Sequence, residues 1–321
     1  MSSSQQIHHS ETIGAELSGL RLDQALARLF SDYSRSRLQG WIREGRVRVD
    51  GVRLKPRDKV FAGQQVELEA VLDAQVPCRP QAIPLEIVHE DEHLIVVNKP
   101  AGLVVHPAAG NPDGTLQNAL LHHDPALEAL PRAGIVHRLD KETTGLMVVA
   151  RTPLAHRNLV EALQARCIKR RYQALVVGRP TAGGTVEAPI GRHPVQRKRM
   201  AVVAGGKPAV THFRIAETFR GHTLLDVELE TGRTHQIRVH MAWLRFPLVG
   251  DPLYGGRLKL PSKAAEETAA ALRDFRRQAL HARRLELEHP ASGESFAWEA
   301  PLPEDFARLL ELLRRDREAH G

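Results

Sequence analysis

Residues 134–150 read GIVHRLDKETTGLMVVA. Two apolar segments, residues 135–136 and 146–150, flank a charged hexapeptide, residues 137–142, which carries four formal charges and a histidine. An ordinary connection between strands is made from Gly, Asn or Pro. The apolar run at 146–150 predicts a buried strand, so the charged hexapeptide is expected to be held at the rim of a core.

The composition is typical of a globular protein, with 42% hydrophobic and 26% charged residues in a chain of 321. That length suits one large domain and one small domain. The chain has no apolar run that is long enough to span a membrane and no signal-peptide pattern, so we expect a cytoplasmic protein without a membrane partner. The two cysteines, Cys78 and Cys167, offer neither a disulfide framework nor a zinc site. The net charge of +7 favours a polyanionic partner.

Two helices and a hairpin are predicted between residues 21 and 57. Apolar residues at positions 22, 25, 26, 29 and 30 form one helical stripe, and SRSRLQGWIREG (34–45) predicts a second helix with Ser34 as its N-cap. In RVRVDGVRL (46–54), Asp50-Gly51 is a strong hairpin turn. The segment has ten Lys or Arg against four Asp or Glu. This charge indicates either a solvated surface or a basic face that follows RNA phosphates.

Shifts in composition divide the chain. Residues 1–18 are expected to be a disordered tail, and residues 76–82, which contain two prolines and show no periodicity, are expected to be a linker. The small domain then covers residues 19–75 and the large domain residues 83–321. From residue 83 onward, short strand-like runs alternate with turns and a few helical stretches. This pattern predicts an α+β fold, in which a small αα-hairpin-β domain precedes a large domain with a mixed, mainly antiparallel sheet.

Most types of chemical site lack their signature in this sequence. His235 and His240 are five residues apart, which turns them away from each other on a helix and on a strand, and no HExxH or CxxC spacing occurs. The sequence also has no phosphate-binding loop, dinucleotide fingerprint or GxSxG elbow. We therefore expect no metal and no cofactor. Carboxylate chemistry at Asp140 remains, with a turn-capping aspartate as the structural alternative.

The segment HRLDKETTGL (137–146) resembles the signature of the ribosomal large-subunit pseudouridine synthases of the A/C/D group, H-R-L-D-x-x-T-[ST]-G-L. Further blocks agree in order, at residues 95–107, 169–178, 191–215, 229–256 and 277–306. Residues 19–75 resemble an S4 RNA-binding domain, which excludes the single-domain A type. The whole pattern is most similar to the D type, which modifies uridines in one hairpin loop of the large-subunit ribosomal RNA.

The resemblance implies roles for three residues. Asp140 is expected to be the catalytic aspartate, acting on the sugar, on the base or on a ribose proton, and Arg238 is expected to pair with it. Tyr172 is expected to stack on the uracil and to take the proton from carbon five. Without the resemblance, Arg238 is equally well an exposed charge on a strand, and Tyr172 an aromatic residue packed on a sheet.

The resemblance also implies RNA contacts. Arg138 is expected to fill the space that a flipped uridine leaves, because its planar guanidinium can stack there. His137 and Thr143 are candidate substrate contacts in the same segment, and His137 equally suits a loop-supporting role. A basic loop, either an RNA contact or a solvated surface, contains Arg192, Arg197, Lys198 and Arg199. On the S4 domain, the residues assigned to RNA are Arg35, Arg37, Arg43, Arg46 and Lys55.

The expected function is the isomerisation of specific uridines to pseudouridine in 23S ribosomal RNA, by a monomeric enzyme that needs no cofactor. The expected partner is this RNA or the assembling large ribosomal subunit. A non-catalytic ribosome-assembly factor of the S4 type is the alternative. The combination of Asp140, Tyr172 and Arg238 favours the enzyme, because a scaffold does not need all three.

Overall fold

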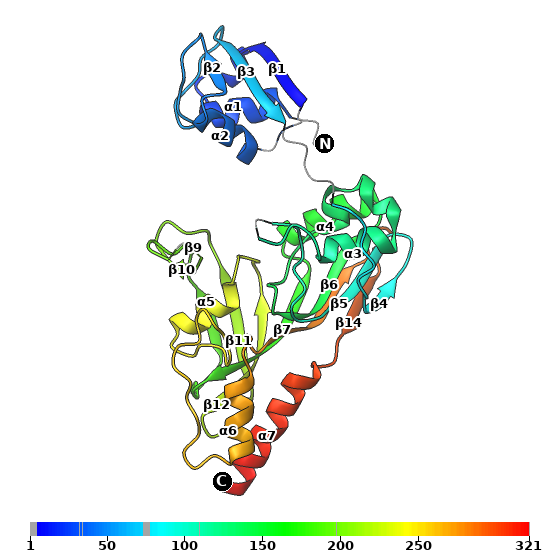
Figure 1. The fold of residues 1–321 in the computed structure, drawn as a ribbon, viewed down its shortest axis with the longest axis vertical. Coiled ribbons are helices and arrows are strands. Elements are labelled where there is room, and N and C mark those ends of the chain that lie inside the picture. The colour runs from blue at the N-terminus through cyan, green and yellow to red at the C-terminus, as the bar shows by residue number, and fades with distance from the viewer. Residues whose placement is uncertain are drawn as a thin grey trace. The chain divides into compact units, whose positions relative to one another are not determined.

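The computed structural model describes residues 5–31, 33, 35–72, 78–108, 110–196 and 198–320. The chain divides into two compact units, Met1–Pro77 and Cys78–Gly321 (Figure 1). The division falls inside the segment expected to be a linker. The predicted N-cap Ser34 lies outside the described residues, as do Arg197 of the basic loop and residues 76–77.

The first unit packs two helices on one small antiparallel sheet. Its helices are α1 (Leu22–Leu29) and α2 (Arg35–Arg43), and a short 3₁₀ helix, η1, covers Ala15–Leu17. The sheet has the order β1-β3-β2, with β1 at Gln5–Thr12, β2 at Val47–Val49 and β3 at Gln65–Leu72. Both predicted helices are confirmed, and their apolar residues, such as Leu26 and Leu38, are fully buried in the core of this unit.

The predicted hairpin turn is confirmed, although the strand after it is not formed as expected. Asp50 and Gly51 both have positive φ, 49° and 77°, which is the backbone of a type I′ turn. Val49 and Val52 bond to each other across this turn with N–H···O distances of 2.9 Å. Beyond Val52 the chain leaves the ladder, and β2 pairs along its length with β3.

The prediction of a disordered tail over residues 1–18 is wrong for the described part of that segment. β1 pairs with β3 over its whole length, from Gln5 opposite Leu72 to Thr12 opposite Gln65. Ile7 packs against the core of this unit, and Ile13 and Leu17 are buried in it. The composition misleads here because a polar edge strand is stabilised by backbone hydrogen bonds to a partner some sixty residues away, which no local window contains.

The second unit is built on one large mixed sheet. Its strands follow the order β4-β5-β6-β13-β7-β12-β11-β8, with β14 paired to β13; only the β13–β6 pair is parallel among these described pairings. This confirms the predicted α+β class. The strand bounds are β4 Ile87–Glu90, β5 Leu94–Lys99, β6 Thr144–Ala150, β7 Lys169–Val177, β8 Gly184–Glu187, β11 Val210–Thr218, β12 His222–Leu229, β13 Leu280–Glu288 and β14 Ser295–Glu299.

Helices and a separate hairpin complete this unit. The hairpin joins β9 (Ile190–Arg192) to β10 (Met200–Val202). The helices are α3 Leu116–His123, η2 Pro125–Ala129, η3 Pro131–Gly134, α4 Pro153–Gln164, α5 Gln236–Trp243, α6 Glu266–Asp274 and α7 Glu304–His320. Within the described residues, every helix is too short or too polar to cross a bilayer.

Strand β6 is buried along its whole length because the sheet is covered on both faces at this point. Met147 and Val149 belong to the cluster that includes α3, whereas Leu146 and Val148 belong to the cluster that includes α4. Successive residues of a strand point to opposite faces, so a strand covered twice must be apolar throughout. The buried strand predicted at 146–150 is therefore confirmed, and it begins earlier, at Thr144.

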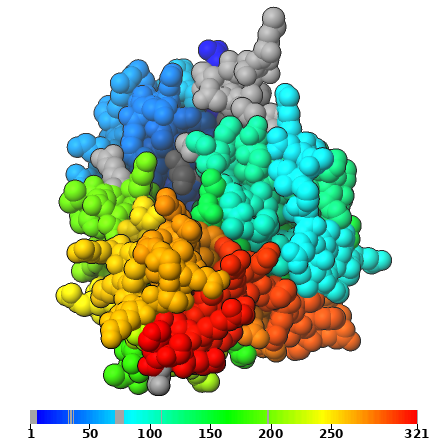
Figure 2. Space-filling model, turned by 60° about the horizontal axis from the view of Figure 1, so that its bottom comes forward, coloured from blue at the N-terminus to red at the C-terminus, as the bar shows by residue number. Residues whose placement is uncertain are grey.

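The C-terminal helix covers one face of the sheet at β7 and β12. Phe306, Leu309 and Leu313 of α7 pack with Leu272 of α6 and Leu224 of β12 in one cluster. In Figure 1, α6 and α7 lie together beside β12, and Figure 2 shows the red helix against the gold segment that contains α6. Leu175 and Val177 of β7 face this cluster, whereas Tyr172, Ala174 and Val176 face the other side, so the face of the sheet that carries Tyr172 is left available for a site.

Deletion of residues 1–12 tests the structural role of β1. We expect the first unit to lose about 1–2 kcal/mol of unfolding free energy, because Ile7 leaves its core and one edge of β3 loses its partner. Hydrogen exchange of the β3 amides measures this change, and the amides of β6 in the second unit serve as the internal control. Unchanged protection in β3 would contradict the structural role.

Candidate active site

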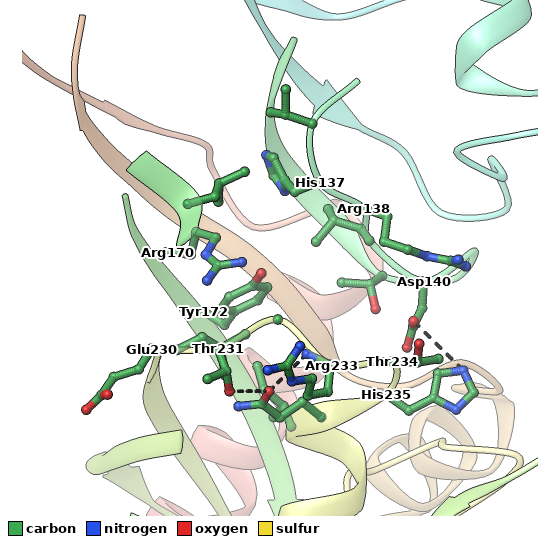
Figure 3. Close-up of a pocket in the computed structure, with 18 of the residues that line it drawn as sticks. His137, Arg138, Asp140, Arg170, Tyr172, Glu230, Thr231, Arg233, Thr234 and His235 are labelled. Carbon is green, nitrogen blue, oxygen red and sulfur yellow. Dashed lines mark hydrogen bonds and ion pairs between the residues drawn. The ribbon is translucent and has the colours of Figure 1, made fainter. Parts of the chain in front are cut away.

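A pocket of about 590 Å³ lies in the second unit (Figure 3). Its walls come from the segment between η3 and β6, from the start of β7, from the connection between β12 and α5, and from α5 itself. Six residues expected from the sequence to form the site lie in these walls: His137, Arg138, Asp140, Thr143, Tyr172 and Arg238. The fold therefore brings together residues that are up to about a hundred positions apart.

The backbone before the charged hexapeptide has an unusual conformation that depends on one glycine. Arg132 and Ala133 have left-handed φ values of 54° and 52°, and Gly134 follows with 78°. A Cβ atom at position 134 would collide with the backbone carbonyl of Ala150 in β6. Glycine is therefore required where the chain passes β6 on its way into the pocket.

Hydrogen bonds from side chains of other segments hold the loop that contains Asp140. The buried Lys99 donates to the carbonyl oxygens of Pro100, Leu103 and Lys141 at 2.8, 2.9 and 2.9 Å. Gln278 donates through Nε2 to Thr143 Oγ1 at 3.0 Å, and both side chains are buried. Thr143 therefore serves as a support of this loop, and its hydroxyl is occupied by a protein partner.

Arg238 links Asp140 to a second, deeper aspartate. Its Nη1 donates to Asp140 Oδ2 at 2.8 Å, while Nε and Nη2 donate to Asp251 at 2.7 and 2.9 Å. Burial disfavours the charged guanidinium, but the hydrogen bonds and charges of Asp251 and Asp140 outweigh it and raise the pKa of Arg238. The alternative of an exposed strand charge is wrong, because Arg238 is 4% exposed and lies on helix α5.

Asp251 is itself held in place by backbone groups. Its Oδ1 accepts the N–H groups of Leu253 and Tyr254 at 2.9 and 3.0 Å, and its side chain is fully buried. Asp251 thus carries most of the neutralisation of Arg238. The Asp140 side chain is 17% exposed and lines the pocket, and its second oxygen accepts no hydrogen bond from the described residues.

His235 and Tyr254 cover the other side of Asp140. His235 Nε2 lies 3.9 Å from Asp140 Oδ1, which is too far for a hydrogen bond, and its Nδ1 lies 2.8 Å from Tyr254 Oη. Burial lowers the pKa of His235, although the charge of Asp140 opposes this change. In the described residues, no three His, Cys, Asp or Glu side chains gather closely enough to hold a metal ion.

Tyr172 lies on β7 with its ring facing the pocket (Figure 3). Its neighbours in the sheet are Val227 and Ala282, and its side chain is almost fully buried. Burial raises the pKa of the Tyr172 hydroxyl, the charge of Arg170 opposes this rise, and the charge of Asp140 adds to it. The phenol is therefore protonated at neutral pH when the pocket holds no ligand.

The other residues assigned to RNA lie outside the pocket. Arg192 ends β9, and Arg199 stacks on the ring of Tyr254 with its guanidinium carbon 5.1 Å from the centroid. In the first unit, Arg35 donates to the buried Asp23 at 2.7 Å, so it also supports that fold. The guanidinium carbon of Arg37 lies 5.9 Å from the centroid of the Trp41 ring. Of the residues of this unit that were assigned to RNA contacts from the sequence, the exposed ones are Arg35, Arg43, Arg46 and Lys55.

Several residues of the site were not expected from the sequence: His106, Arg132, Arg170, His235 and Asp251. Arg170 could have been found, because it lies two residues before Tyr172 on a strand and therefore on the same face. Asp251 lies within a block that carries the family resemblance, but its spacing to Arg238 gives no sign of their contact.

His137 supports the loop and is uncharged. Its Nε2 accepts the backbone N–H of Val148 at 3.1 Å. Burial lowers the pKa of His137 to about 3, and the charge of Arg170 acts in the same direction. The loop-supporting role considered for His137 is therefore present in the structure, and its contact with substrate remains a prediction.

His137→Gln tests the buried neutral ring. Between pH 6.5 and about 3, the unfolded chain binds a proton that the folded chain excludes, so this histidine's contribution to stability is complete above pH 6.5 and is lost as the pH falls toward 3. The variant keeps an acceptor for Val148 and cannot titrate. We expect the pH slope of the unfolding free energy in this window to fall by up to about 1.4 kcal/mol per unit.

Urea unfolding from pH 7 to pH 4 measures this slope. His122→Gln, at an exposed histidine, is the control for loss of an imidazole on the surface. An identical slope in wild type and the His137 variant would show that the ring is not excluded from protonation.

Family models match two parts of the chain. Residues 93–243 match the RNA pseudouridylate synthase family, and residues 20–66 match the S4 domain. Both matches agree with the resemblance noted in the sequence. The second match lies within the first structural unit and the first within the second unit.

Curated relatives match over nearly the full length. A Pseudomonas aeruginosa protein is 60% identical, with 98% of this chain and 99% of that protein covered. One from Escherichia coli K12 is 56% identical, with 98% and 97% covered. Both are called ribosomal large subunit pseudouridine synthase D.

Among solved structures, human RNA pseudouridylate synthase domain containing 4 is 30% identical with a TM-score of 0.56, and the match covers 71% of this chain and 93% of that one. These relatives do not support the alternative of a non-catalytic assembly factor. The chain therefore belongs to the RNA pseudouridylate synthase family and is a pseudouridine synthase with an N-terminal S4 domain.

Proposed function

We propose that this enzyme converts specific uridines in one hairpin loop of 23S ribosomal RNA to pseudouridine, with Asp140 as the catalytic aspartate. The names of the relatives support the large ribosomal subunit as the source of the substrate. The observation that carries the proposal is the 2.8 Å contact between Arg238 and Asp140, two residues 98 positions apart, in one pocket with Tyr172. The reaction is an isomerisation that imports neither a group nor electrons, so it needs no cofactor.

Asp140 suits this role because Arg238 orients its carboxylate at the pocket wall. Arg238 orients one carboxylate oxygen, and Asp251 neutralises Arg238, so the pair leaves Asp140 as a carboxylate with one oxygen available to a ligand. Such a group can attack the sugar, attack the base or remove a ribose proton. All three roles place Asp140 next to the glycosidic bond.

Tyr172 supplies an aromatic face in the same pocket. Stacking of uracil on this face holds the base near Asp140. The hydroxyl is then the candidate acceptor of the proton that leaves carbon five. Because burial raises its pKa, the phenolate is a minor species at neutral pH, and the rate of this step is expected to increase toward alkaline pH.

The substrate base must leave its stack to enter this pocket, at a cost of a few kcal/mol. Arg138 is exposed at the pocket wall and forms no hydrogen bond or ion pair with the part of the chain that the structure describes. Its planar guanidinium is therefore available to stack in the gap that the uridine leaves. His137 stays behind it as a support.

The first unit is proposed to bind the same RNA. Arg37, Arg43, Arg46 and Lys55 add positive charge on α2 and on the loops around β2, which suits contacts with phosphates. The basic loop with Arg192 and Arg199 is proposed as a further RNA contact of the second unit. We propose a monomer that acts in the cytoplasm on free ribosomal RNA or on the assembling large subunit.

Asp140→Asn tests the catalytic assignment. We expect the rate of pseudouridine formation in 23S RNA to fall by about 10⁴-fold or more, because the amide keeps the shape of the side chain but loses its charge. Pseudouridine-specific chemical sequencing of the RNA measures the product. The melting temperature and the Kd for RNA should change little, because Asp251 still neutralises Arg238.

Asp251→Asn is the matched comparison. It leaves the buried Arg238 without its main partner and should cost about 3–5 kcal/mol of stability. Retained activity in Asp140→Asn would show that the catalytic carboxylate lies elsewhere.

Tyr172→Phe separates stacking from proton transfer. The aromatic face remains, so RNA affinity should be kept, while the rate at saturating RNA should fall by about 10²–10⁴-fold and lose its rise between pH 7 and pH 9. Single-turnover kinetics across this range measure both effects. A wild-type rate in the variant would limit Tyr172 to stacking.

A further inference from the structure

Arg170 is a buried cation without a partner. Its side chain lines the pocket, and the residue is only 8% exposed. Its Nε is buried without a hydrogen bond, and no carboxylate pairs with its guanidinium anywhere in the described chain. Burial of an unpaired charge costs several kcal/mol, so proteins rarely retain one without a use for it.

The surrounding arginines show that this lack of pairing is specific to Arg170. Arg171 points to the other face of β7 and contacts Glu228 and Glu286 at 3.1 and 3.2 Å. Arg166, also in the pocket wall, pairs with Glu230. Acidic side chains are therefore abundant near β7, but none of them reaches Arg170.

The guanidinium of Arg170 lies at the pocket wall. A Cβ atom at Gly232 would lie 2.9 Å from Arg170 Nη1, so the guanidinium lies against the backbone that joins β12 to α5. Figure 3 shows Arg170 and Tyr172 side by side on β7, across the pocket from Asp140. A guanidinium at this position can donate hydrogen bonds to a ligand in the pocket.

His137 adds a second donor to this part of the pocket. Its Nε2 accepts the Val148 N–H, so the single proton of the neutral ring lies on Nδ1. That Nδ1 is buried and makes no hydrogen bond with the described residues. Two residues that line the pocket, one of them charged, therefore each have an N–H donor without a hydrogen-bond partner in the described chain.

We propose that Arg170, together with Nδ1 of His137, binds the exocyclic oxygens of the target uracil and stabilises the negative charge that the base carries when its glycosidic bond is broken. This inference rests on the proposed function and adds a catalytic residue to it. Tyr172 holds the face of the base, Asp140 lies next to the glycosidic bond, and Arg170 acts at the edge of the base.

The reaction creates a negative charge on the base that such a group would stabilise. When the bond between C1′ and N1 breaks, its electron pair stays on the base and spreads from N1 to the two exocyclic oxygens, so the free base is an anion. After the base has turned, C5 uses an electron pair of this anion to bond to C1′. The C5 proton then leaves, and N1 gains a proton, so atoms and electrons balance without a further reactant.

The experiment compares three variants in single-turnover reactions at saturating 23S RNA. We expect Arg170→Met to lower the rate by at least about a hundredfold, as does the loss of one hydrogen-bond donor to a developing charge. Its Kd for RNA should stay within about threefold of the wild-type value. Arg170→Lys should restore part of the rate. Arg171→Met removes a charge from the other face of the same strand and should leave the rate unchanged.

The melting temperature separates this role from a structural one. Because Arg170→Met removes an unpaired buried charge, we expect its melting temperature to equal or exceed that of wild type while the rate falls. A fall in melting temperature that accompanies the fall in rate would identify a structural residue and overturn the inference. A weaker Kd with an unchanged saturated rate would assign Arg170 to an RNA phosphate and would also overturn it.

The two proposals fail differently. If the wild-type protein forms no pseudouridine in 23S RNA, the proposed function is wrong and the role of Arg170 is wrong with it. If the wild type is active and Arg170→Met is equally active, only the role of Arg170 is wrong.

Discussion

The rest of the site depends on the complete pairing of one buried guanidinium. Arg238 is shared between Asp140 and Asp251, and each of its contacts comes from a different part of the chain. A buried arginine must find such partners, or its charge destabilises the fold. Helix α5, the turn after Asp251 and the charged hexapeptide therefore have to meet at one point. Their meeting leaves Asp140 charged and oriented at the pocket wall.

The charged side chains are paired on one side of the pocket and unpaired on the other. Around Asp140 the charges are paired and the loop is supported by Lys99 and Gln278, so the position of the carboxylate is fixed before RNA arrives. Around Arg170 a charge is left unpaired, and the described protein provides no acceptor for it. The pocket therefore holds a paired carboxylate on one side and an unpaired cation on the other.

The arginines of the first unit are divided between support of its fold and the exposed surface. Asp23 is buried and accepts hydrogen bonds from Arg21, Arg35 and Gln39, so part of the positive charge on α1 and α2 serves the fold. The added strand β1 covers one edge of β3. β3 is therefore the central strand of this sheet, and the polar strand β1 forms its edge.

The sequence by itself determined the features that depend on local pattern: the helices at 22–29 and 35–43, the Asp50-Gly51 turn, the buried strand of β6 and the α+β class. The family signature identified Asp140, Tyr172 and Arg238, which the structure brings into one pocket. Only the tertiary structure decided that residues 5–12 form a strand, that Arg238 is buried on a helix, that Asp251 neutralises it and that Arg170 has no partner. Each of these depends on contacts between residues distant in sequence, and burial and pairing are properties of the assembled chain that no local window contains.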